Sequence, residues 1–276
     1  MRKWIDLNSD MGESFGNYVL GRPEEVMKLI NHANVACGFH AGDPTWMRRT
    51  VEWAKKYGVT LGAHPGFPDL MGFGRRLMNI TAQEARDYVV YQVGALKAFA
   101  GMVGVKLEAA KPHGAFYVWA QQSEENARAV LEGFQAVDPD LVAYLPGLPR
   151  YPLLDTAERM GFRVVKEFYP GLVYGDDGTI TVKRTYGRED VDEMVGLVMK
   201  FVKEGKVTSS SGKDIEVQAE SICVHGDVIN APEVLQELRA ALARDGVEVR
   251  SALRAAGRAA GRAAGQAVTQ EKGATA

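Results

Sequence analysis

Seven short apolar runs alternate along this chain with segments long enough to form amphipathic helices. This alternation predicts parallel strands that are joined by right-handed helical crossovers. The chain has 276 residues, of which 46% are hydrophobic, and that is enough to bury one large core. The expected strands are Trp4–Leu7, Ala33–Cys37, Val59–Ala63, Val105–Ala110, Leu141–Leu145, Arg163–Phe168 and Ser221–Val224.

The segments between these runs carry helix signals. Asp43 is a candidate N-cap, and Thr81 with Glu84 has the pattern of a capping box. A glycine-rich loop is expected after the sixth strand, then a hairpin over Val207–Val217 and a last short strand over Val247–Val249. The expected helices lie near Pro23–Ile30, Pro44–Tyr57, Ala82–Met102, Glu124–Ala136, Tyr151–Met160, Glu189–Glu204 and Pro232–Arg244.

The parity of side chains along the expected strands distinguishes an open sheet from a barrel. Asp6 and Asn8 share one face of the first strand, and Lys111 and His113 share one face of the fourth. An open sheet is covered by helices on both faces, so both faces should be apolar. Small and polar residues on one face instead fit a barrel interior that opens into a ligand site. We therefore predict an α/β fold, a distorted seven-stranded (β/α)7 barrel, as a single catalytic domain over residues 1–250.

Composition and charge exclude several classes of protein. With a net charge of −2, no electrostatic footprint of a nucleic-acid-binding protein is visible. No run approaches the ~18 apolar residues of a membrane span, and no signal peptide is expected. Cys37 and Cys223 lie far apart in apolar segments, which suggests two buried free thiols and a cytoplasmic protein. Residues 251–276 form a low-complexity Ala/Arg/Gly tail for which no chemical role is expected.

Four of the five histidines follow the end of an expected strand. In parallel barrels the active site is built from residues at these ends. Two acids, Asp6 and Asp10, lie around the end of the first strand, whereas His32 is expected to cap the end of a helix. Because four histidines occupy the same position relative to a strand, we interpret them as one functional set and not as four unrelated core residues. The four are His40, His64, His113 and His225.

Imidazole and carboxylate groups allow two kinds of chemistry. They are ligands for zinc or another divalent ion, and the metal set would be Asp6, Asp10, His40 and His64. They also serve as general acids and bases without a metal. Spacing alone does not separate these two hypotheses.

Several loops add candidate binding residues. Arg75 and Arg76 follow Gly74, and their guanidinium groups are suited to binding a carboxylate or a phosphate. Lys111 points inward and needs an anionic partner or a catalytic task. No P-loop sequence is present. The candidates for substrate binding are Asn8, Glu13, Asp43, Arg75, Arg76 and His225.

Five segments at the expected strand ends resemble the LamB/YcsF family. In chain order they read DLNSDMGESFG, NVACGFHAGDP, GAHPGFPDLMGFGRR, KPHGAFY and ICVHGD, and the match runs from Ile5 to about Val249. The resemblance implies a barrel like those of the glycoside hydrolase/deacetylase superfamily. It also implies ATP-dependent hydrolysis of 5-oxo-L-proline to L-glutamate, with ATP as co-substrate and in complex with 5-oxoprolinase subunits B and C.

For that reaction the strand-end residues receive roles. Asp10 and His40 are base candidates, and His64 and His113 are acid candidates. Lys111 would stabilise developing negative charge.

The chain departs from the family pattern at one segment. The family has Glu-Phe-Ala-Asp-Arg after the sixth strand, whereas residues 167–171 read EFYPG here.

Two alternatives stay open. One is a metal-dependent deacetylase or amidohydrolase that acts alone, and the other is a non-catalytic subunit that binds substrate. A homo-oligomer is also compatible with the sequence.

Overall fold

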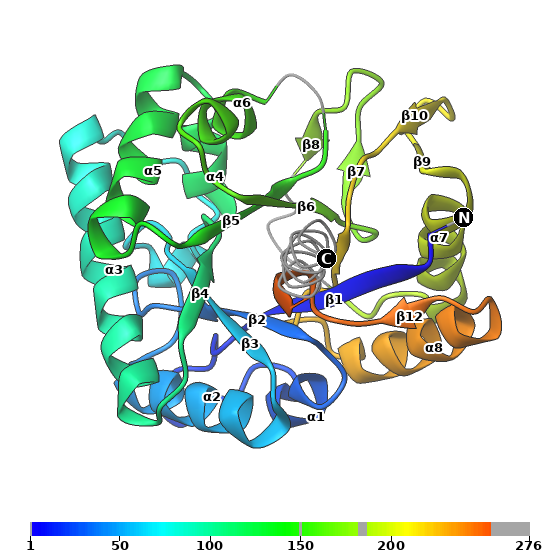
Figure 1. Ribbon diagram of the computed structural model, residues 1–276, viewed down its shortest axis with the longest axis horizontal. Coiled ribbons are helices and arrows are strands. Elements are labelled where there is room, and N and C mark those ends of the chain that lie inside the picture. Colours follow the sequence, from blue (N-terminus) through cyan, green and yellow to red (C-terminus); the bar gives the residue numbers. More distant parts are fainter. Residues whose placement is uncertain (1, 149–150, 182–186, 255–276) are drawn as a thin grey trace, which may run out of the picture.

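Seven parallel strands close into a barrel in the computed structural model, which describes residues 2–148, 151–181 and 187–254. Neighbouring strands follow chain order, and β11 pairs with both β6 and β1 to close the ring. Figure 1 shows this ring with the helices outside it. The predicted (β/α)7 barrel is thus confirmed. The strands are β1 (Trp4–Met11), β2 (His32–Ala36), β3 (Thr60–His64), β4 (Leu107–Ala110), β5 (Val142–Pro146), β6 (Val164–Phe168) and β11 (Ser221–Cys223).

The helices form where the amphipathic segments predict them. Asp43 caps α2 by accepting hydrogen bonds from the backbone N–H groups of Thr45 and Trp46, and Thr81 forms its capping box with Glu84. One short helix, α4, was not foreseen. The helices of the described residues are α1 (Pro23–Met27), α2 (Pro44–Tyr57), α3 (Ala82–Met102), α4 (Gly114–Ala120), α5 (Glu124–Val137), α6 (Pro152–Arg159), α7 (Val191–Glu204) and α8 (Ala231–Arg244). None of them is long and apolar enough to cross a membrane.

Short antiparallel hairpins decorate the barrel. The expected hairpin is present as β9 (Lys206–Thr208) and β10 (Asp214–Glu216). The glycine-rich loop predicted after the sixth strand is instead a hairpin of β7 (Val173–Tyr174) and β8 (Ile180–Thr181). Tyr174 of this hairpin is buried, and its hydroxyl accepts a hydrogen bond from the N–H of Tyr169 and donates one to the C=O of Tyr169. A 3₁₀ turn, η1 (Leu70–Gly72), lies in the loop after β3.

Side chains alternate between the barrel interior and the helices, as the parity predicts. Residues such as Leu7 and Leu61 pack under the helices in the main core. The interior carries polar side chains that form hydrogen bonds with one another. Asn34 donates to Asn8 at 2.9 Å, and Asn8 donates to Ser221 at 2.7 Å.

His32 does not cap a helix, which corrects the sequence expectation. Helix α1 ends at Met27, and His32 begins β2 with its ring inside the barrel, stacked on Tyr144 at 4.2 Å between centroids. Burial, with the charge of Lys111, lowers the pKa of His32 to about 3, so the ring is neutral.

The end of the barrel opposite the strand C-termini is closed by the chain's own C-terminal segment. Strand β12 (Glu248–Val249) pairs in parallel with β1. Ala252 and Leu253 are buried against Tyr144 and Val165. Packing therefore continues past residue 250, where the sequence placed the end of the domain. The tail from residue 255 onward lies outside the described residues.

Candidate active site

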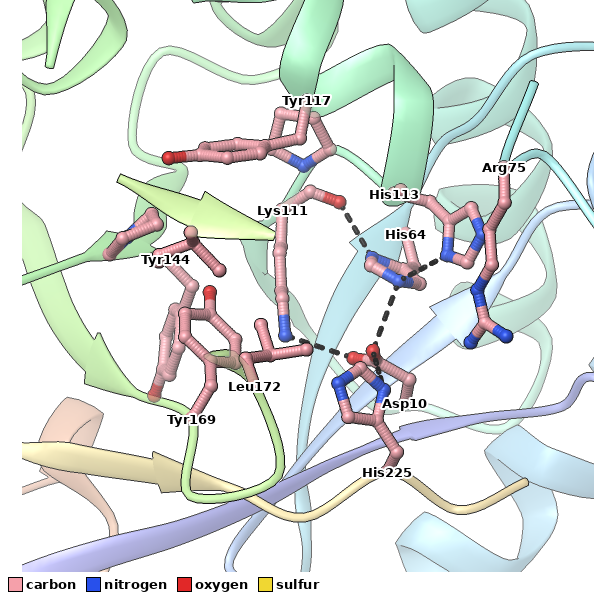
Figure 2. A pocket seen from close by; sticks show the side chains of 14 residues that line it. Asp10, His64, Arg75, Lys111, His113, Tyr117, Tyr144, Tyr169, Leu172 and His225 are labelled. Carbon is pink, nitrogen blue, oxygen red and sulfur yellow. Dashed lines mark hydrogen bonds and ion pairs between the residues drawn. The ribbon is translucent and has the colours of Figure 1, made fainter. Parts of the chain in front are cut away.

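A largely apolar pocket opens at the C-terminal ends of the strands, where barrel enzymes hold their active sites. Figure 2 shows its two sides. Tyr144, Tyr169 and Leu172 form one side, and the imidazoles of His64 and His113 form the other. The Lys111 side chain extends between the two sides toward Asp10.

Two imidazoles on the polar side are fixed by backbone carbonyls. Nδ1 of His64 lies 2.8 Å from the carbonyl oxygen of Lys111, and Nε2 of His113 lies 2.8 Å from that of Phe73. A carbonyl oxygen only accepts, so both of these nitrogens donate. The two remaining nitrogens, His64 Nε2 and His113 Nδ1, are 3.0 Å apart.

His40 and Glu13 complete a buried group around these rings. His40 stacks on His113 with centroids 3.7 Å apart, and its Nε2 lies 3.4 Å from a carboxylate oxygen of Glu13. Burial and then neighbouring imidazole charge lower the pKa of His40 and of His113 well below the usual range. Burial, with the charges of Asp227 and Asp10, raises the pKa of Glu13 well above its usual range.

Asp10 and Lys111 form a buried ion pair. The Lys111 ammonium lies 3.0 Å from Asp10 and 3.4 Å from Glu167. Burial disfavours both charges, but the charges of His64 and Lys111 hold the pKa of Asp10 well below its usual range. Burial likewise opposes the Lys111 charge, yet Asp10 raises its pKa well above the usual range. Lys111 thus has the anionic partner that its inward position requires.

The other carboxylate oxygen of Asp10 faces two histidines. It lies 3.3 Å from His64 Nε2 and 3.4 Å from His225 Nδ1. His225 reaches this position from the loop after β11. The structure therefore brings Asp10, His40, His64, His113, Lys111 and His225 together, as their strand-end positions predict.

Asp6 is not part of this group, although the sequence included it in a metal set. It precedes Asp10 by four residues on β1, which corresponds to ~13 Å along a strand. Its carboxylate accepts hydrogen bonds from Ser221 at 2.8 Å and Tyr144 at 3.3 Å. Burial raises its pKa to about 7.

The other binding candidates divide into those near the pocket and those away from it. Arg75 lines the pocket and pairs with Asp227 at 3.1 Å. Arg76 is exposed and pairs with Asp69. Asn8 is buried below the pocket in the interior network, and Asp43 serves as the cap of α2.

Sequence reasoning missed several residues of the site. Glu167 and Cys223 share the inward parity of β6 and β11, and this signal was sufficient to place them. The Cys223 thiol, buried and free as expected, lies 3.2 Å from the Lys111 ammonium. Tyr169 donates to Glu167 at 2.6 Å and sets its ring centroid 5.0 Å from the Lys111 nitrogen. It stands where the chain departs from the family pattern, so no motif indicated it.

The relatives of this chain among known proteins share one name. A relative from Pyrococcus abyssi, named as the A subunit of 5-oxoprolinase, is 48% identical over 89% of this chain and 96% of its own length. One from Alkaliphilus metalliredigens with the same name is 45% identical over 90% of this chain and 96% of its own length.

Solved structures agree with the barrel. The lactam utilization protein from Thermus thermophilus is 41% identical, covers 90% of this chain and 99% of its own, and superposes with a TM-score of 0.81. A putative cellobiose-phosphate cleavage protein from Enterococcus faecalis shares only the fold, at 11% identity and a TM-score of 0.53 over 91% of this chain and 98% of its own. The LamB/YcsF family model matches residues 5–257. This chain therefore belongs to the LamB/YcsF family.

Proposed function

We propose that this chain is the A subunit of a multi-subunit 5-oxoprolinase. It would open the ring of 5-oxo-L-proline to give L-glutamate, with ATP as co-substrate and with subunits B and C as partners. The names of relatives at 45–48% identity support this proposal, as does the name of the solved lactam utilization protein.

The observation that carries the proposal is the Asp10–Lys111 pair at the polar end of a pocket whose other side is apolar. A small lactam is likewise apolar on one side and polar on the other. Its methylene groups suit the aromatic side formed by Tyr144 and Tyr169, and its amide suits the side that carries charge and imidazole. The Arg75 guanidinium lines the pocket where it can hold a carboxylate or a phosphate.

The proposed chemistry begins from an unreactive amide. The γ-phosphoryl group of ATP is transferred to the amide oxygen, and ADP leaves. Water then attacks the activated carbon and the carbon–nitrogen bond breaks, which leaves an acyl phosphate. A second water hydrolyses this acyl phosphate to the carboxylate, and inorganic phosphate is released. The ring nitrogen takes up a proton as it leaves.

This chain's side chains fit the needs of those steps. Lys111 stabilises the negative charge on the phosphoryl group as it is transferred to the amide oxygen and later leaves. Asp10 holds that ammonium in place, and water activation is assigned to the imidazole group around His64, which Asp10 contacts. The low pKa of Asp10 makes it a weak base, so positioning and charge compensation suit it better than proton abstraction.

Exposed apolar side chains beside the pocket support the multi-subunit part of the proposal. A groove next to Glu13 and His40 is lined by exposed apolar residues of the loops after β1 and β3. Patches of this kind mark interaction sites, and we assign this one to a partner subunit of the complex. Its most exposed members are Tyr18, Val19, Leu70 and Met71.

The test is glutamate release from 5-oxo-L-proline. It is measured with this chain alone and with the chain mixed with subunits B and C, each with and without ATP. We expect release only from the mixture with ATP. No release from any mixture would refute the proposal.

A second candidate is a metal-dependent deacetylase or amidohydrolase that acts alone. The close grouping of Glu13, His40, His64 and His113 favours it, because imidazole and carboxylate are zinc ligands. It differs in needing neither ATP nor partners. ATP-independent cleavage of acetylated sugars or simple amides by the isolated chain would support it over ring opening.

A non-catalytic role is the weaker alternative. A scaffold gains nothing from burying Asp10, Lys111 and Glu167, because each buried charge carries a desolvation cost.

A further inference from the structure

The contact between His64 and His113 poses a chemical problem. Each ring donates through one nitrogen to a backbone carbonyl, so in the neutral form each remaining nitrogen carries a lone pair. These two nitrogens face one another at 3.0 Å. Two lone pairs at this distance repel. The contact is stable only with a proton on one of the nitrogens or a cation bound by both.

His40 presents a second unsatisfied group at the same place. Its ring is fully buried, and within the described part of the chain neither of its nitrogens has a hydrogen-bond partner. Its Nε2 faces Glu13 at 3.4 Å. Buried polar nitrogens are normally hydrogen-bonded, so an unpaired imidazole here requires an explanation.

We propose that Glu13, His40, His64 and His113 form a binding site for one divalent cation, with zinc as the best-suited ion. One ligand atom from each residue lies within 4.8 Å of those of the other three. A cation between the facing nitrogens of His64 and His113 removes their repulsion. It also gives the unpaired His40 ring and the buried Glu13 carboxylate a partner. Three imidazoles and one carboxylate are a ligand set that zinc accepts.

The surroundings are those of a metal site. The carbonyl groups of Lys111 and Phe73 orient the rings of His64 and His113 through their far nitrogens, as outer partners do for metal-bound histidines.

A neighbouring group of Asp10, Cys223 and His225 also meets the geometric requirement for a metal. It is the poorer site because the Lys111 ammonium lies 3.0 Å from Asp10 and 3.2 Å from the Cys223 sulfur. A fixed positive charge in contact with two of three ligands repels a second cation. The cation site is thus assigned to the set without a cysteine, which is Glu13, His40, His64 and His113.

The catalytic role of the cation rests on the proposed function. A cation at His64 and His113 adjoins the pocket where the lactam would lie. With Nε2 of His64 on the cation, the imidazole group would activate water through the bound ion, which polarises it, and not by taking its proton directly. Binding of the cation, in contrast, is a property of this chain alone.

The test measures metal binding to the isolated full chain, without ATP, 5-oxo-L-proline or partner subunits. The protein is stripped with a chelator and titrated with Zn²⁺ by calorimetry, and bound metal is counted by elemental analysis. Co²⁺ then replaces Zn²⁺ as an optical probe. We expect one ion per chain and a cobalt spectrum without a sulfur-to-metal charge-transfer band.

Variants separate the two sets of ligands. E13Q and H40N should each weaken Zn²⁺ binding at least tenfold, and C223S should bind like the wild type. Circular dichroism melts confirm that each variant is folded. If H40N fails to fold, E13Q still tests the site, because glutamine has the shape of glutamate but lacks the carboxylate that would bind the cation. Absence of a stoichiometric ion in the wild type, or loss of binding in C223S but not in E13Q, would overturn the proposal. These results do not depend on ring opening, so the two proposals fail separately.

Discussion

The Lys111 ammonium lies 3.0 Å from the Asp10 carboxylate, and both side chains are almost completely buried at the mouth of the barrel. Lys111 comes from the segment after β4 and Asp10 from the C-terminal part of β1, so the pair joins opposite sides of the ring. Glu167 and Cys223 approach the same ammonium. One lysine therefore lies against two buried acidic side chains.

Removal of this lysine should be costly. In K111M the carboxylates of Asp10 and Glu167 lose their counter-charge, and breaking a buried ion pair from one side costs about 3–5 kcal/mol. Urea unfolding measures the loss, and glutamate release by the complex should disappear. K97M is the matched control, because Lys97 pairs with Asp138 at the surface, where a pair contributes about 0–1 kcal/mol. Equal losses in the two variants would contradict the role given to Lys111.

The barrel could be predicted because its signal is repeated. Seven apolar runs with one polar face give a closed parallel sheet, and four histidines at strand ends mark its mouth. Each of these features depends on local parity, which a sequence displays directly.

The rest of the site depends on contacts between distant segments. Asp6 has the inward parity of Asp10, yet depth along β1 separates them, so Ser221 and Tyr144 become its partners. His32 looked like a helix cap because α1 was expected to run three residues further than Met27. Tyr169 enters the pocket through a turn that no motif describes. Parity gives the direction of a side chain, but depth and loop path come only from the tertiary structure.

The two adjacent arginines should differ in their effect on substrate. Arg75 lines the pocket, whereas Arg76 is exposed and pairs with Asp69. R75K replaces a planar guanidinium, which is able to hold a carboxylate through two parallel hydrogen bonds, with a single ammonium. We expect the KM for 5-oxo-L-proline or for ATP to rise about tenfold, as for a loss of ~1.4 kcal/mol. R76K should leave both KM values unchanged. Steady-state kinetics of the reconstituted complex measure these KM values. A raised KM in R76K but not in R75K would refute the assignment of Arg75 to substrate binding.

The exposed apolar groove should be needed for assembly. Met71 is 96% exposed in the loop after β3, and M71E places a charge where a partner surface would exclude water. We expect M71E to lose co-elution with subunits B and C in size-exclusion chromatography. Met102 is 74% exposed at the end of α3, on the opposite side of the barrel from the pocket, so M102E should assemble normally. Normal assembly of M71E would remove this groove from the interface.

The pKa of Asp6 should make stability depend on pH. Burial raises it to about 7, above the value of about 3.9 expected in the unfolded chain. Between these values the folded state binds a proton that the unfolded state has released, so this group lowers stability as the pH rises from 4 to 7. The neutral His32 acts in the opposite sense, because its pKa is lowered to about 3 and charging it below pH 6.5 favours the unfolded chain.

The effects of Asp6 and His32 on stability overlap in the wild type, so the difference between D6N and wild type isolates the effect of Asp6. We expect this difference in unfolding free energy, measured with urea, to shift in favour of D6N by up to about 4 kcal/mol from pH 4 to pH 7. Above pH 7 it should remain constant. A difference that does not change with pH would show that Asp6 is ionised throughout this range.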